Sequence, residues 1–130
     1  MNTELTYLAW ITAITAVMWV PYILDRAAVW GITDTVGYPD NPKPQSAWAR
    51  RMKAAHANAV ENLVVFATLV LAANALGITG GVVATAAIVY FWSRIVHAVA
   101  YTAALPWVRT LGFTGGFLAQ MAVAWQILGR

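Results

Sequence analysis

The sequence predicts an all-α integral membrane protein that folds as a bundle of four membrane-spanning helices. Of its 130 residues, 61% are hydrophobic and only 10% are charged, whereas a soluble domain carries about 25% charged residues. Four apolar runs are each long enough to cross a hydrocarbon core about 30 Å thick. The length suits one domain. The absence of cysteine excludes disulfides, thiolate metal sites and a cysteine nucleophile.

The first span is predicted at about residues 4–30. Its segment Leu5–Leu24 carries no charge and is long enough to cross the membrane. Pro21 lacks a backbone N–H and is expected to kink this helix. Because neither a basic segment nor a small-residue cleavage site marks a signal peptide, we expect this span to be retained.

A loop is predicted at residues 31–46, and it is the only long loop. Gly37 and three prolines lie within it, and such residues are typical of turns. Ser46 is expected to cap the second span, which is predicted at about residues 47–76. The pair Gly80-Gly81 predicts a tight turn into the third span.

The third and fourth spans are predicted at about residues 82–105 and 107–128, with Pro106 closing the third. Three glycines of the fourth span are expected to allow close helix packing: Gly112, Gly115 and Gly116.

The distribution of basic residues predicts the orientation in the membrane. Five of the eight Lys and Arg residues lie between Arg26 and Lys53. Cytoplasmic loops of membrane proteins are enriched in Lys and Arg, so we expect loop 31–46 and Arg109 on the cytoplasmic side. Four spans then place both termini on the opposite side. No extended basic face exists elsewhere, so nucleic-acid binding is not expected.

Polar residues share one face of the second span. On a helix, Arg51, Asn58, Glu61 and Asn62 fall within about 100° of arc, whereas His56 points almost the opposite way. Lipid offers these side chains no partners, so a polar stripe in a membrane helix is expected to have a function. His56 is interpreted as a hydrogen-bonded packing or inter-subunit residue.

The third span has a similar stripe. Tyr90, Arg94, His97 and Tyr101 lie within about 60° of one another around the helix. An arginine inside a span needs an anionic partner or water. Glu61, as the only acidic residue predicted within a span, is the expected partner.

Two interpretations of these charges remain open. A pair of Glu61 and Arg94 could simply hold spans two and three in register. However, one carboxylate cannot neutralise all the cations expected near it, and such a site would suit an anionic ligand with carboxylates of its own. The cations expected near Glu61 are Arg26, Arg51, Arg94 and Arg109.

No metal site is predicted, because His56 faces away from Glu61 and no HExxH-type spacing occurs.

Three motifs in these spans resemble those of the MAPEG family, the membrane-associated proteins of eicosanoid and glutathione metabolism. The resemblance covers essentially the whole chain, and the short loops and Ala-rich spans are similar to those of bacterial members. We therefore expect a bacterial inner membrane, with membrane lipids as neighbours. The motifs are Ala55-His56-x-Asn58-x-x-Glu61-Asn62, Arg94-x-x-His97-x-x-x-Tyr101 and Pro106-x-x-Arg109.

The resemblance implies a homotrimer that binds glutathione as cosubstrate between adjacent subunits, near the cytoplasmic face. In the family, the residues matching Asn58 and Glu61 hold the amino and carboxylate groups of glutathione. The residue matching Arg109 is the proposed stabiliser of its thiolate and hence the catalytic residue. Further positions expected to line or contact the site are Arg26, Arg94, His97 and Tyr101.

One position departs from the family pattern. Ala54 stands where relatives usually carry an arginine that binds a glutathione carboxylate. Arg51, one turn earlier on the same face, is hypothesised to substitute for it.

Three functions remain open. The first is a glutathione transferase or peroxidase that acts on hydrophobic electrophiles or lipid hydroperoxides, which would enter from the lipid between spans one and four. The second is a non-catalytic homologue with the same pocket, which binds another anionic amphiphile or serves a structural role. The third is a membrane scaffold whose buried charges serve assembly alone.

Overall fold

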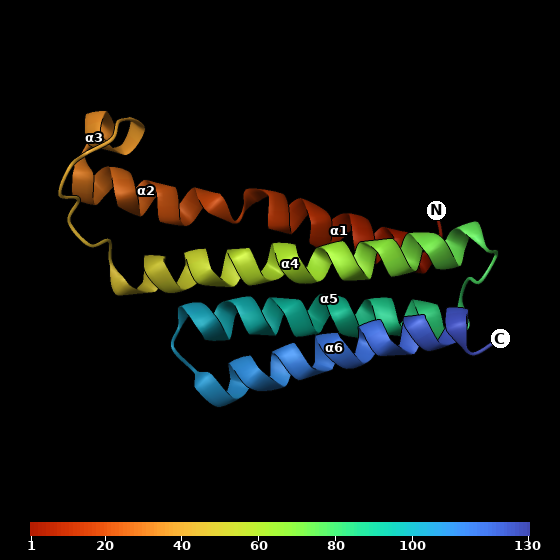
Figure 1. Cartoon of the computed structure of the whole chain (residues 1–130). Coiled ribbons are helices and arrows are strands. Elements are labelled where there is room, and N and C mark those ends of the chain that lie inside the picture. Colours follow the sequence, from red (N-terminus) through yellow and green to blue (C-terminus); the bar gives the residue numbers. More distant parts are fainter.

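The computed structural model describes residues 1–130 and contains helices but no strands. Figure 1 shows an elongated bundle with the N- and C-termini at one end and the long loop at the other. Four segments are long and apolar enough to cross a membrane. The predicted fold class, an all-α bundle of four spans, is therefore confirmed. The helices are α1 (Thr3–Val17), α2 (Trp19–Trp30), α3 (Ile32–Val36), α4 (Ala47–Ala75), α5 (Gly81–Thr102) and α6 (Pro106–Leu128).

The first span is interrupted near Pro21, as predicted. Helix α1 ends at Val17 and α2 begins at Trp19, so the break lies at Met18. Because Pro21 has no N–H to donate to the carbonyl of Val17, one helical hydrogen bond is lost there. The N–H of Met18 bonds to the carbonyl of Thr15, three residues earlier, at 3.4 Å.

The loop between the first two spans is more ordered than predicted, because residues 32–36 form the short helix α3. Ser46 stands at the N-cap position of α4, but the predicted capping bond from its side chain is absent. Its backbone N–H donates instead to Asp25 Oδ2 at 3.1 Å, and Gln45 Nε2 donates to the same oxygen at 3.2 Å. These bonds fasten the end of the loop to α2.

The third span is shorter than predicted at its C-terminal end. Helix α5 ends at Thr102, and Ala104 has a φ of 60°. A left-handed residue is incompatible with a continuing helix. Pro106 becomes the first residue of α6, where its missing N–H costs nothing.

Close packing of α5 against α6 depends on the glycines of the fourth span, as predicted. A Cβ at Gly112 would lie 2.9 Å from the backbone nitrogen of His97, and a Cβ at Gly116 would lie 3.2 Å from Cδ of Arg94. At Gly112 the contact is with backbone and leaves no room for a side chain, whereas at Gly116 the Arg94 side chain would have to shift. The hydrophobic core lies at the same level and includes stacked rings of Phe66 and Tyr90, 3.8 Å apart.

Helices α4 and α5 form the centre of the bundle. Helix α5 packs against α1, α4 and α6, and α4 packs against the same two outer helices. Figure 1 shows α1 and α6 on opposite sides of this pair. Within one protomer, spans one and four therefore do not form the entrance that was predicted for a hydrophobic substrate.

A basic pocket at the loop end of the bundle

Arg94 lies in the interior of the bundle and bonds to Asn58. Its side chain is 4% exposed, and Nη2 donates a hydrogen bond to Asn58 Oδ1 at 2.5 Å. The Nε and Nη1 atoms are buried without a partner. The cavity beside Arg94 measures about 20 Å³, which accommodates about one water molecule. In this protomer, glutathione has no room to contact Arg94.

The predicted ion pair between Glu61 and Arg94 is wrong for the protomer. Glu61 is exposed on the outer surface of α4, whereas Arg94 points between the helices toward Asn58. The two residues lie on facing helices, but helical periodicity predicts only which face of its own helix a residue occupies. Glu61 therefore remains an acidic side chain without a partner inside a span.

The polar layer around Arg94 extends to a residue that the sequence analysis missed. Asn62 Nδ2 donates to the backbone oxygen of Asn58 at 2.9 Å, and Gln120 Nε2 donates to the backbone oxygen of Asn62 at 3.2 Å. Gln120 is buried on α6. Its amide within the apolar fourth span is a signal that could have identified it. This layer links α4, α5 and α6 at one depth of the bundle.

A second residue was also missed, at the other end of the bundle. Glu4 is 0% exposed, and its Oε1 accepts a hydrogen bond from the N–H of Gly80 at 3.0 Å. Glu61 is therefore not the only acidic residue within a span. The position of Glu4 in the first turn of α1, before an apolar run, was the available signal.

Both histidines contact aromatic side chains. The ring of His97 is 3% exposed and contacts Tyr101 and Phe113, with ring centroids 5.7 and 6.2 Å away. His97 therefore does not line the pocket described below. His56 faces away from the polar stripe, as predicted, and its Nδ1 shares a hydrogen bond of 2.8 Å with the hydroxyl of Tyr22.

Three of the predicted site residues meet in one pocket at the loop end of the bundle. Arg51 of α4, Tyr101 of α5 and Arg109 of α6 line a cavity of about 270 Å³, together with the turn that joins α5 to α6. The guanidinium carbon of Arg109 lies 5.1 Å from the ring centroid of Tyr101, a cation–π contact that orients the arginine. Arg51 Nε donates to the backbone oxygen of Thr102 at 2.9 Å.

This basic pocket contains two guanidinium groups and no acidic residue. A guanidinium remains charged in a protein and carries five N–H donors. Of the five donors of Arg51, the bond to Thr102 uses only one. The surplus of positive charge that the sequence predicted is therefore present, but around Arg51 and Arg109 instead of beside Glu61. Chemically, the pocket suits a carboxylate, a thiolate or a phosphate.

Arg26 is not part of the basic pocket in the protomer. Its Nε donates to Gln45 Oε1 at 3.4 Å, and its guanidinium carbon lies 5.0 Å from the ring centroid of Trp30. Both contacts place Arg26 at the end of α2, beside the long loop.

The sequence model of the MAPEG family matches residues 6–129. The chain belongs to the MAPEG family. That family includes glutathione transferases and peroxidases as well as non-catalytic members. No curated protein and no solved structure matches this MAPEG chain.

Proposed function

We propose that this MAPEG protein is a glutathione-dependent transferase or peroxidase of the membrane, which binds glutathione in the basic pocket. The observation that carries the proposal is the convergence of Arg51 and Arg109 on one cavity without an acidic residue. Glutathione carries two carboxylates and a thiol. A guanidinium can donate two parallel hydrogen bonds to one carboxylate, so arginine binds carboxylates well. Its single ammonium group requires an acidic partner elsewhere.

Glu61 is the proposed partner of that ammonium group, in an assembly of several copies. Its carboxylate faces outward from α4, and a charge facing hydrocarbon is costly. A neighbouring protomer packed on this face would remove Glu61 from lipid. The basic pocket alone measures about 270 Å³, below the roughly 300–1,000 Å³ typical of small-molecule sites. We therefore infer that a subunit boundary completes the site, and we propose the homotrimer that the family resemblance implies.

The exposed face of α4 supports this assembly. It consists of small and medium-sized side chains around the single carboxylate, so another helix can approach closely. Between residues 54 and 71 its exposed members are Ala54, Ala57, Val60, Glu61, Val64, Val65, Thr68 and Leu71.

The proposed chemistry begins with the glutathione thiolate. A free thiol has a pKa near 8.5, and the thiolate is the nucleophile. Arg109, already oriented by Tyr101, would stabilise the anion by charge and hydrogen bonding. A decrease of two units in the thiol pKa corresponds to about 2.7 kcal/mol. Arg94 cannot reach this ligand in the protomer and acts as a positioning residue, because it holds Asn58.

Two reactions are open to such a thiolate. With an electrophile, the sulfur forms a bond to carbon while the leaving group departs or a ring opens. With a lipid hydroperoxide, the sulfur attacks the terminal oxygen, the O–O bond breaks and an alcohol and glutathione sulfenic acid form. A second glutathione then gives the disulfide and water. The electrons therefore come from glutathione, and the protein supplies no redox group.

The membrane orientation belongs to the same proposal. The basic pocket, Arg26 and the basic start of α4 lie at the loop end of the bundle (Figure 1). By the distribution of positive charge, this end faces the cytoplasm of a bacterial cell, where glutathione would be available, and both termini face the opposite side.

The test is glutathione itself. Millimolar glutathione should raise the melting temperature of the purified protein in detergent and produce the ultraviolet absorbance of a bound thiolate. S-methylglutathione, which has no thiol proton to lose, should stabilise the protein without the thiolate signal. If glutathione causes neither a melting shift nor thiolate absorbance, the proposal fails.

One observation favours a second function, that of a non-catalytic MAPEG protein binding another anionic amphiphile. Ala54 lies on the exposed face of α4 where the family pattern has an arginine, so one expected ligand for a glutathione carboxylate is missing. A protein of this kind would be stabilised by anionic amphiphiles and unaffected by glutathione.

A further inference from the structure

Arg94 is a buried cation whose hydrogen-bonding capacity is largely unused. Its side chain is 4% exposed, and it bonds to one other side chain, the neutral amide of Asn58. The Nε and Nη1 atoms carry most of the N–H donors of the guanidinium, and both atoms are buried without a partner. A buried charge is costly unless an opposite charge and hydrogen bonds compensate it. An anion beside Arg94 would therefore be favourable.

The chain offers no carboxylate for this position. None of its five acidic residues lines the cavity beside Arg94. Glu61 is exposed on the outer surface of α4, and Glu4 is bonded to the N–H of Gly80. The other three acidic residues lie in or beside the long loop. A second copy of the chain cannot supply a carboxylate either, because Arg94 is covered by its own protomer.

The small cavity beside Arg94 is the place where an anion can lie. It measures about 20 Å³, and Arg94 is the only charged residue that lines it. The hydroxyl of Thr15, on the same wall, already donates to the backbone oxygen of Ile11 at 2.7 Å. Most of the remaining wall is apolar, so an occupant would be bound chiefly by the guanidinium. The apolar members are Ile11, Ile14, Met18, Ala59, Ile95 and Ala98.

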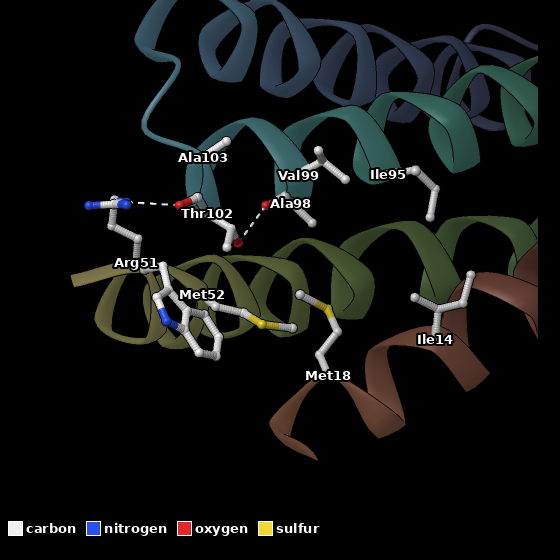
Figure 2. A pocket seen from close by; sticks show the side chains of 10 residues that line it. Ile14, Met18, Arg51, Met52, Ile95, Ala98, Val99, Thr102 and Ala103 are labelled. Carbon is white, nitrogen blue, oxygen red and sulfur yellow. Dashed lines mark hydrogen bonds between the residues drawn. The ribbon is translucent and has the colours of Figure 1, made fainter. Parts of the chain in front are cut away.

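The cavity adjoins a larger groove, of about 620 Å³, whose lining is drawn in Figure 2. Ile14 and Met18 from the first span, and Ile95 and Ala98 from α5, line both the groove and the cavity. One layer of side chains therefore separates the two. Met18 lies at the break between α1 and α2, and methionine side chains are flexible. Movement of Met18 would give a small ion a route from the groove to Arg94.

The size of the cavity determines which anion fits. It accommodates about one water molecule, so carboxylates and phosphates are too large for it. Chloride is monatomic and only slightly larger than water. We propose that this cavity binds a chloride ion, which accepts hydrogen bonds from Nε and Nη1 of Arg94 and neutralises its charge. At low chloride concentration, a water molecule takes its place. This site is separate from the basic pocket and requires no glutathione.

Thermal unfolding in detergent tests the proposal, with chloride and gluconate compared at the same ionic strength. Gluconate is too large for the cavity. Chloride at about 0.2 M should therefore raise the melting temperature of the wild type by at least about 3 °C relative to gluconate. Bromide, which is also monatomic, should act similarly. No glutathione is present, so the result is independent of the proposed transferase.

Two matched substitutions on α4 locate the ion. Ala59 lines the cavity, whereas Ala67, two turns later, does not. Ala59→Val places two methyl groups at the cavity wall and should abolish the effect of chloride, while Ala67→Val should retain it. Each variant is compared with itself in gluconate, so the general cost of a larger side chain cancels. Arg94→Met should also abolish the effect. Chloride bound only by the arginines of the basic pocket would survive both Ala59→Val and Arg94→Met.

Bromide soaked into crystals of the protein gives a direct view of the site, because its anomalous scattering identifies it. We expect an anomalous peak in contact with the guanidinium of Arg94. Three results would overturn the proposal. They are equal melting temperatures of the wild type in chloride and gluconate, an effect of chloride that persists in Ala59→Val or Arg94→Met, and no anomalous peak beside Arg94. The first would show that the cavity holds water alone.

Discussion

Arg94 and Asn58 join the two central helices through a hydrogen bond of 2.5 Å from Nη2 to Oδ1. This is the one side-chain hydrogen bond that the buried guanidinium makes, because its Nε and Nη1 have no protein partner. The bond therefore leaves a charged group dependent on a neutral amide and on whatever water occupies the small cavity beside it.

Asn58→Ala should destabilise the protomer by about 1.5–3 kcal/mol, the range for a hydrogen bond to a charged group. Unfolding by a denaturing detergent, followed by circular dichroism, measures this loss. Thr68→Ala is the matched control, since Thr68 lies on the same helix, is exposed and bonds only within its own helix. The double variant Asn58→Leu with Arg94→Met should recover much of the stability, because it removes the buried charge and its partner together. Equal stability of Asn58→Ala and the wild type would contradict this role.

Arg109→Ala should abolish glutathione binding and the thiolate signal while the oligomer stays intact. The Arg109→Lys variant retains the charge but lacks the planar guanidinium that donates two parallel hydrogen bonds. It should therefore retain part of the binding and less of the thiolate absorbance. Titration calorimetry and size-exclusion chromatography with light scattering report the two properties separately. Dissociation of the oligomer in Arg109→Ala would indicate instead a scaffold whose charges serve assembly.

Glu61→Gln should weaken glutathione binding about tenfold, since it removes the proposed partner of the ammonium group. An analogue of glutathione without its amino group should bind wild type and Glu61→Gln equally well. The comparison isolates one contact, because both ligands retain the thiol and both carboxylates. Equal losses for the two ligands would place Glu61 in folding or assembly and away from the ammonium group.

Glu4 fastens the first helix to the turn before α5, through its bond to the N–H of Gly80. Glu4→Ala should destabilise the protein by about 1–3 kcal/mol, because it leaves that N–H without its partner. Glu4→Gln retains an accepting oxygen and should have a smaller effect. Thr3→Ala, at an exposed neighbour, serves as control. Thermal unfolding in detergent ranks the variants, and no difference between Glu4→Ala and Thr3→Ala would show that the bond contributes nothing.

The spans and the break near Pro21 could be predicted from the sequence because they depend on local properties. An apolar run long enough to cross a bilayer forms a span wherever it occurs in the chain. A residue without a backbone N–H interrupts a helix in the same way, whatever the rest of the fold. The third span was predicted three residues too long, since the left-handed conformation of Ala104 has no signature in residue type. Likewise, α3 in the loop carries no strong helical pattern.

The candidate site was predictable in its residue types but not in its pairings. Helical spacing assigned Glu61 and Arg94 to faces, yet it could not show that Arg94 turns inward to Asn58 while Glu61 stays outside. The convergence of Arg51 and Arg109 depends on how the ends of α4, α5 and α6 come together, which is a property of tertiary packing.

The central claim is that the basic pocket of Arg51 and Arg109 requires an outside anion to complete it. The most direct measurement is a cryo-electron microscopy map of the protein in lipid nanodiscs with millimolar glutathione. We expect three protomers, with glutathione density at the subunit boundary and its sulfur within hydrogen-bonding distance of Arg109. A map in which this pocket is filled by an acidic side chain of a neighbouring subunit, with no ligand density at saturating glutathione, would contradict the claim.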